Sequence, residues 1–125
     1  MTARVLVVDD DDPIRRLMAR ALIHAGYETA EARNGEEALS YIVSGDQADV
    51  VLLDLMMPVK SGFDFIERLR SERPECLGRV IVVTAASQYV TRHLDRRGLF
   101  AILEKPFDIG QLIRTVSDCA ASLEH

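Results

Sequence analysis

Four short runs of consecutive apolar residues divide the chain, at residues 5–8, 50–53, 80–83 and 100–103. Runs of this length, rich in branched aliphatic side chains, predict strands buried on both faces, as in a parallel sheet. A more polar stretch over residues 27–32 predicts a further strand that suits the edge of the sheet. The pattern of apolar and polar positions therefore indicates five strands.

Apolar residues between these runs recur at helical spacing. They predict helices over about residues 14–25, 36–42, 63–70, 88–97 and 109–120. The predicted inward-facing residues are Ile14, Leu17, Met18, Ala21 and Leu22 in the first helix, Phe63, Ile66 and Leu69 in the third, and Ile109, Leu112, Ile113, Val116 and Ala120 in the last. Arg15, Arg16 and Arg20 are expected on the opposite, solvent-facing side of the first helix.

Strands that alternate with helices are typical of βαβ units and a parallel sheet. Right-handed crossovers then favour a doubly wound α/β sandwich with strand order 2-1-3-4-5 and helices on both faces. The length of 125 residues suits one domain, which we assign to residues 1–122. Residues 123–125, Leu-Glu-His, are expected to be the remnant of an expression tag.

Charge and composition narrow the function classes. The formal net charge of −5 argues against direct binding of nucleic acid, which requires a basic face. The two cysteines, Cys76 and Cys119, match no metal-binding spacing and are expected to be free thiols in a reducing cytoplasm. No apolar run approaches the roughly 20 residues that span a bilayer, so a cytoplasmic protein without a membrane anchor is expected.

Side chains that could take part in catalysis or bind a metal ion follow the predicted strands. Asp9 and Asp10 end the first strand, Asp54 the third, Thr84 the fourth and Lys105 the fifth. The carboxyl ends of parallel strands meet at one edge of a sheet, where ligands bind. Crowded carboxylates favour a divalent cation such as Mg²⁺, while a hydroxyl and an ammonium group suit phosphoryl oxygens. The pattern predicts a phosphoryl-transfer site in which Asp54 is the nucleophile.

Four motifs in this order resemble the receiver domain of two-component response regulators. They are Val7-Val8-Asp9-Asp10, Asp54-Leu55-Met56-Met57-Pro58 with Gly62 eight places after the aspartate, Thr84-Ala85, and Lys105-Pro106-Phe107. Each motif alone is weak, but together they are specific, and the resemblance covers residues 4 to about 121. It implies a flavodoxin-like fold similar to that of chemotaxis regulators.

The resemblance implies roles for the acidic residues. Asp54 would accept a phosphoryl group from a phosphohistidine, carried by a sensor histidine kinase or a histidine phosphotransfer protein. Asp10 would bind Mg²⁺ directly, Asp9 would assist, and the backbone carbonyl of Met56 would be a further ligand beside Asp54. The domain would be a phosphoacceptor that catalyses only its own phosphorylation and dephosphorylation.

The resemblance also implies a conformational switch. Thr84 would bind a phosphoryl oxygen and change rotamer on activation, Lys105 would pair with another oxygen, and the Lys105-Pro106 peptide would be cis. The family usually carries an aromatic switch residue three places before Lys105, where this chain has Ile102. Strand alternation places Phe100 on the same face as Ile102, which leaves open whether Phe100 substitutes.

The resemblance implies interaction partners, and the sequence is also compatible with two alternative functions. A homodimer through the fourth helix, fifth strand and fifth helix is expected by resemblance, and so is an output domain beyond residue 122. The basic run Arg92, His93, Arg96 and Arg97 is either this interaction surface or a solvated helix face. One alternative is a small phosphatase or mutase, and another is a degenerate receiver that binds partners without phosphorylation.

Overall fold

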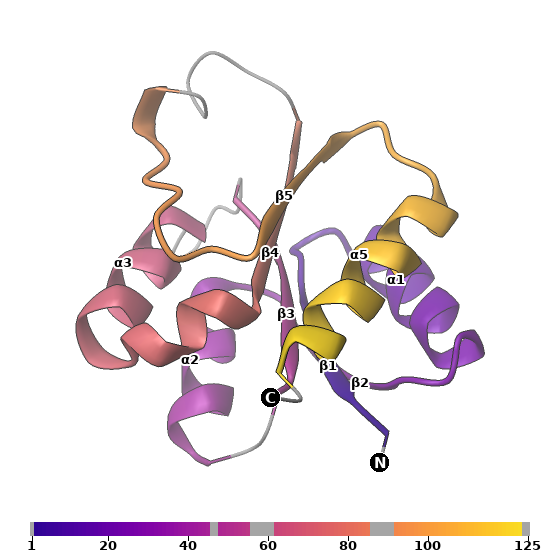
Figure 1. Cartoon of the computed structure of the whole chain (residues 1–125), viewed down its shortest axis with the longest axis horizontal. Helices are drawn as coiled ribbons and strands as arrows, with labels where there is room; N and C mark the ends of the chain where they lie inside the picture. Colours follow the sequence, from indigo (N-terminus) through magenta and orange to yellow (C-terminus); the bar gives the residue numbers. More distant parts are fainter. Residues whose placement is uncertain (1, 46–47, 56–61, 86–91, 124–125) are drawn as a thin grey trace.

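The computed structural model describes residues 2–45, 48–55, 62–85 and 92–123. Its strands all pair in parallel, in the order β2-β1-β3-β4-β5 (Figure 1). They are β1 (Arg4–Val8), β2 (Glu28–Ala32), β3 (Val50–Asp54), β4 (Val80–Ala85) and β5 (Ala101–Lys105). The predicted doubly wound sheet and its strand order are confirmed.

Helices cover both faces of this sheet. The helices are α1 (Asp12–His24), α2 (Gly35–Val43), α3 (Gly62–Glu72) and α5 (Ile109–Ser122), with a short 3₁₀ helix η1 (Pro74–Arg79) between α3 and β4. Figure 1 shows α2 and α3 on one side of the sheet and α1 and α5 on the other. Among the described helices, none combines the length and apolar composition needed to cross a membrane.

The structure describes only residues 92–97 of the helix predicted over residues 88–97. Residues 86–91 lie outside the described part of the chain. Arg92 and His93 are helical, but Leu94, Asp95 and Arg96 are not. The predicted end at Arg97 is therefore wrong, and the chain instead leaves the helix at Leu94, whose side chain is buried against the core.

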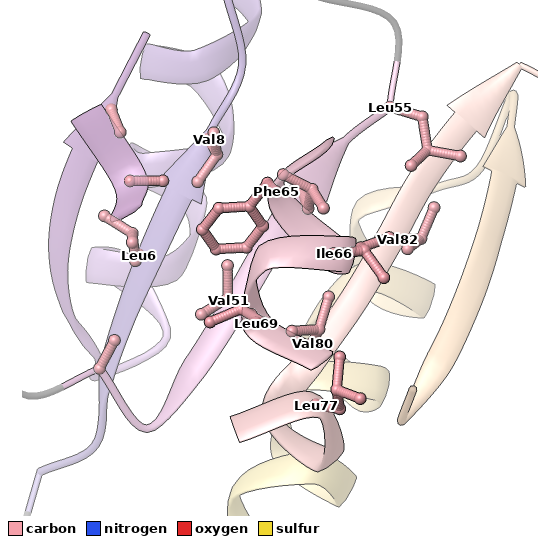
Figure 2. Packing of buried hydrophobic residues seen from close by; sticks show 14 of the residues in the cluster. Leu6, Val8, Val51, Leu55, Phe65, Ile66, Leu69, Leu77, Val80 and Val82 are labelled. Carbon is pink, nitrogen blue, oxygen red and sulfur yellow. The ribbon is translucent and has the colours of Figure 1, made fainter. Parts of the chain in front are cut away.

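The hydrophobic core consists of two clusters separated by the sheet. On the α2 and α3 side, Phe65, Ile66 and Leu69 of α3 pack against alternate residues of β1, β3 and β4. Figure 2 shows the Phe65 ring beside Leu6, Val8 and Val51. The sequence predicted Phe63 as the inward aromatic, but Phe63 is only partly buried and Phe65 is fully buried. The other cluster lies under α1 and α5.

The buried face of α1 is rotated from the predicted one. Arg15 is only 5% exposed, whereas Ile14 and Leu17 are 39% and 60% exposed. The expectation that Arg15 faces solvent is wrong, because its guanidinium donates hydrogen bonds to Glu31 of β2 and to the Asp9 carbonyl after β1, and these partners allow a charge to be buried. Ile109 of α5, 44% exposed, is likewise outside the core that the pattern predicted for it.

Helix starts follow the sequence chemistry. The side chains of Asp11, Asn34 and Asp108 each accept a hydrogen bond from a backbone N–H three residues later, at the first turns of α1, α2 and α5. An aspartate directly before a helical apolar pattern predicts a cap, and the bond from the Gln111 N–H to Asp108 confirms this for the last helix. Each cap satisfies a backbone N–H in the first turn of its helix that has no partner within the helix.

Candidate functional site

The register of the sheet brings the polar strand ends together. Val8 of β1 pairs with Leu53 of β3, so Asp9 and Asp54 each follow a paired residue on neighbouring strands. Asp54 in turn pairs with Val83 of β4, the residue before Thr84. The three neighbouring strands therefore end at a common edge.

Asp9, Asp10 and Asp54 form an acidic cluster at this edge. One carboxylate oxygen from each lies within 4.8 Å of the others. Asp9 is 1% exposed and Asp54 is 9% exposed, whereas Asp10 is exposed to solvent. Burial of like charges at this spacing is unfavourable without a cation, and oxygen donors of this kind are those that Mg²⁺ prefers.

One carboxylate oxygen of Asp9 receives no hydrogen bond from the described residues. Its Oδ1 accepts a hydrogen bond from the Asp11 N–H at 2.9 Å, but its Oδ2 is buried and has no hydrogen-bond partner among the described residues. Burial raises the pKa of Asp9, the Asp11 hydrogen bond and the Lys105 charge lower it, and Asp10 raises it further. A buried acceptor without a donor is rare in native proteins, and a bound cation would satisfy it. The donor set therefore fits a hard divalent cation.

Thr84 and Lys105 complete the rim from β4 and β5. Thr84 is 1% exposed, and its hydroxyl donates to the Ala85 carbonyl at 3.2 Å. Ala85 pairs with Lys105 in the sheet, and the Lys105-Pro106 peptide is cis, as the resemblance implied. The positive charge of Lys105 lowers the pKa of Asp9.

Ile102, at the position of the expected switch residue, and Phe100 lie on opposite faces of the sheet. Ile102 is partly buried against the α2 and α3 cluster, while Phe100 packs on the opposite side of the sheet, against the α1 and α5 cluster. The expectation that Phe100 shares the face of Ile102 is wrong, because Phe100 precedes β5 and does not follow its alternation. Phe100 therefore does not replace the missing aromatic side chain in this structure.

Two other expectations have different outcomes. Met56, whose carbonyl was expected to bind the cation, lies outside the described residues.

In the basic run, the Arg97 guanidinium pairs with Asp95 at 2.8 Å, which removes part of the positive charge from this surface. Arg70 of α3 donates to the backbone carbonyls of Asp95 and Arg97, at 3.0 and 2.8 Å, and ties the segment before β5 to α3.

Arg15 was missed as a residue of the site. Its Nη1 donates to the backbone carbonyl of Asp9 at 3.0 Å, directly behind the acidic cluster. The available signal was an arginine one turn into a helix that follows an acidic loop. Local sequence does not show that this arginine is buried, because its partner Glu31 lies 16 residues away on β2.

The fold and the acidic rim define a flavodoxin-like α/β domain with a site suited to a divalent cation and a phosphoryl group. A family model for the response regulator receiver domain matches residues 5–117. The chain belongs to the response regulator receiver domain family, whose members are signalling domains of two-component systems. The predicted family is thereby confirmed.

Similar proteins agree with this membership. The chain is 35% identical over 115 residues to the DNA-binding transcriptional regulator NtrC of Azospirillum brasilense, covering 91% of this chain and 23% of that protein. It is 38% identical over 115 residues to the regulatory protein AtoC of Escherichia coli K12, covering 90% of this chain and 24% of that protein. The chain thus spans about a quarter of the length of these curated relatives.

Solved structures match over nearly their whole length. A CheY-like receiver domain protein from Methanospirillum hungatei JF-1 superposes with a TM-score of 0.86 at 27% identity, covering 99% of this chain and 98% of that one. The response regulator TrrA from Thermotoga maritima, in complex with Mg²⁺ and BeF, has a TM-score of 0.81 at 33% identity, covering 94% and 99%.

Proposed function

We propose that Asp54 is the phosphoacceptor of this receiver domain and that Asp9, Asp10 and Asp54 together hold a Mg²⁺ ion. The observation that carries the proposal is the acidic cluster, with one oxygen from each of three carboxylates within 4.8 Å of the others and a buried Asp9 oxygen to which none of the described residues donates. The TrrA relative in complex with Mg²⁺ and BeF supports the same assignment. The carbonyl of Met56 remains the expected further ligand.

The chain's own groups would divide the reaction between them. A carboxylate oxygen of Asp54 attacks the phosphorus, a new O–P bond forms, and the P–N bond of the donor phosphohistidine breaks, so that the imidazole leaves with the electron pair. Bound Mg²⁺ would supply positive charge that offsets the negative charge on the oxygens of the transferring phosphoryl group. The Lys105 ammonium and the Thr84 hydroxyl donate hydrogen bonds to phosphoryl oxygens of the product.

Asp54 suits the nucleophile role by its position. It ends the central strand β3, between β1 with its acids and β4 with Thr84. Its 9% exposure leaves an approach from solvent but little water around the carboxylate. Charge interactions in such a partly dry site are stronger than in bulk water, which favours their use on a charged phosphoryl group.

Receiver domains of response regulators receive phosphoryl groups from sensor kinases, and we propose the same donor class for this chain. A homodimer through the surface that includes β5 and α5 is a further proposal, supported by the family resemblance. The greater length of the NtrC and AtoC relatives supports an output domain beyond residue 122. We propose a cytoplasmic location, since a receiver must meet its kinase there.

The family membership supports the phosphorylated receiver over the two alternatives. A phosphatase or mutase of this chemistry commonly has a second acid two places after the nucleophile, and this chain has Met56 there. A degenerate receiver would not be expected to retain every acidic, hydroxyl and ammonium group of the site. We therefore propose a domain that acts only on its own aspartate.

Asp54→Asn tests the proposal. Incubation with acetyl phosphate and Mg²⁺, followed by intact-mass measurement, is expected to add one phosphoryl group to the wild-type chain and none to the variant. The amide is a far weaker nucleophile than the carboxylate it replaces. Omission of Mg²⁺ is expected to remove the adduct from the wild type.

Asp118→Asn is the matched control, because Asp118 is exposed on α5 and outside the acidic cluster. It should be phosphorylated like the wild type. An adduct of wild-type stoichiometry on Asp54→Asn would overturn the assignment of the nucleophile. A folded wild type that takes no phosphoryl group would favour the partner-binding alternative.

A further inference from the structure

The Arg15 guanidinium is buried directly behind the acidic cluster. Its side chain is 6% exposed, although it lies near the start of a surface helix. Nη1 donates to the backbone carbonyl of Asp9 at 3.0 Å and pairs with Asp12 at 2.7 Å. Nε donates to Glu31 of β2 at 2.9 Å. One side chain thus joins α1, β2 and the loop that carries the acids.

These contacts hold the Asp9 backbone from two sides. The Asp9 N–H donates to the Ala32 carbonyl of β2 at 3.1 Å, and its carbonyl accepts from Arg15. The Asp9 Oδ1 is also engaged, by the Asp11 N–H. Oδ2 alone is left without a donor among the described residues. The backbone and one oxygen are therefore fixed, which fixes the direction of the other oxygen.

We propose that Arg15 is a positioning residue, which holds Asp9 so that its Oδ2 meets the cation with little rearrangement and thereby raises the affinity of the site for Mg²⁺. Arg15 would act through the Asp9 carbonyl and not by contact with the cation or the phosphoryl group, because its donors are directed at the Asp9 carbonyl, Asp12 and Glu31. The inference rests on the proposed function, in which the acidic cluster binds Mg²⁺. Groups that orient a metal ligand in this way commonly change metal affinity when they are removed.

The effect of Arg15 is geometric and does not come from its charge. Asp12 and Glu31 place two carboxylates on the guanidinium, so the three groups together carry no positive charge toward the cluster. A positive charge in this position would in any case oppose a cation. The planar fork of arginine reaches partners in several directions at once, whereas a lysine ammonium is a single compact charge. Arg15→Lys is therefore not expected to restore the function of Arg15.

Mg²⁺ titration by isothermal calorimetry tests the proposal directly. Arg15→Gln is expected to weaken Mg²⁺ binding about 10-fold, and Arg15→Lys by a similar factor. Glu31→Gln weakens one of the interactions that hold the Arg15 guanidinium and is expected to lower the Mg²⁺ affinity by a smaller factor. Arg20→Gln, the same change at an exposed position of α1, is the matched control and should bind like the wild type.

Phosphorylation by acetyl phosphate provides a second readout. In Arg15→Gln the Mg²⁺ concentration for half-maximal rate should rise by the factor found in the titration, while the rate at saturating Mg²⁺ should stay near that of the wild type. A merely structural role of Arg15 would lower the free energy of unfolding in urea and leave the Mg²⁺ affinity of the folded chain unchanged.

Unchanged Mg²⁺ affinity in a folded Arg15→Gln chain would overturn the positioning role and leave the proposed function intact. Failure of the wild type itself to bind Mg²⁺ would instead overturn the proposed cation site. Where Arg15→Gln does not fold, Glu31→Gln decides the matter: weaker Mg²⁺ binding supports the role, and wild-type binding overturns it.

Discussion

At the scale of single residues, buried polar groups concentrate at the site. The buried polar or charged residues of the described chain are Asp9, Arg15, Asp54 and Thr84. All lie at strand ends on the rim or at the start of α1. Burial of a polar group is unfavourable unless a partner compensates for lost water. Arg15 is compensated by Asp12, Glu31 and the Asp9 carbonyl. Under the proposed function, a cation and a phosphoryl group would compensate the burial of Asp9, Asp54 and Thr84.

A buried cysteine predicts how stability depends on pH. Burial raises the pKa of the Cys119 thiol from 9.0 to about 11. Above pH 9 the unfolded chain loses this proton before the folded chain does, so the free energy of unfolding falls as pH rises toward 11. The contribution is fully present below pH 9, and about 1 kcal/mol is lost midway through this window. Urea unfolding of the wild type and Cys119→Ala across this window measures the loss.

Cys119→Ala should flatten the pH dependence in that window, whatever it does to stability at neutral pH. Cys76→Ala is the matched control, because Cys76 is only half-buried, and it should keep the wild-type slope. Equal slopes in the wild type and in Cys119→Ala would show that the buried thiol is not the cause.

At the scale of elements, the start of α3 packs unusually close to the end of β3. The Gly62 N–H donates to the Leu55 carbonyl at 3.1 Å. A Cβ at Gly62 would lie 2.6 Å from the Leu55 Cα and 2.7 Å from the Asp54 carbonyl oxygen. Both of these atoms belong to the backbone, so neither can move aside cheaply. The glycine of the sequence motif is thus explained by close approach beside the candidate nucleophile.

Gly62→Ala is therefore expected to lower the free energy of unfolding by about 1–3 kcal/mol, because the added methyl group must push α3 away from β3. Equilibrium urea unfolding measures the change. Gly78→Ala is the matched control, since a Cβ there meets no atom within 4 Å. It should change stability by no more than about 0.5 kcal/mol. Equal effects of the two changes would contradict the close-packing explanation.

The whole molecule couples its stability to the site through Asp9. Two apolar clusters on opposite faces of the sheet support the fold, while the acidic rim opposes it. A ligand that binds only the folded state stabilises it by mass action, by about 2.7 kcal/mol at a concentration 100 times its Kd. Under the proposed function, Mg²⁺ should therefore raise the melting temperature of this chain.

Asp9→Asn should reverse this balance. Without Mg²⁺ the variant is expected to be more stable than the wild type by about 1–3 kcal/mol, since it removes a buried charge whose Oδ2 receives no hydrogen bond within the described part of the chain. With Mg²⁺ it should gain less than the wild type. Thermal unfolding with and without Mg²⁺ measures both effects, and Asp118→Asn should behave like the wild type. A less stable variant with full Mg²⁺ stabilisation would contradict the role of Asp9.

Much of the architecture follows from local patterns that need no tertiary information. Apolar runs predict the central strands, because a strand covered on both faces must be apolar throughout. Helix caps such as Asp108 are also local, since the side chain and the N–H it satisfies are three residues apart. The acids at strand ends were predicted together because parallel strands bring their carboxyl ends to one edge. These features determined the fold class and the composition of the candidate site.

Only the tertiary structure decided which side of an element is buried when the pattern is ambiguous. Helical periodicity placed Arg15 in solvent, but partners from a loop and from β2 allow its burial. Strand alternation placed Phe100 with Ile102, but Phe100 lies before β5 and packs on the other face. The sequence by itself determined the groups available at the rim, since residue type and strand order suffice for that. Their burial and their supports depend on contacts between distant segments, which no local pattern contains.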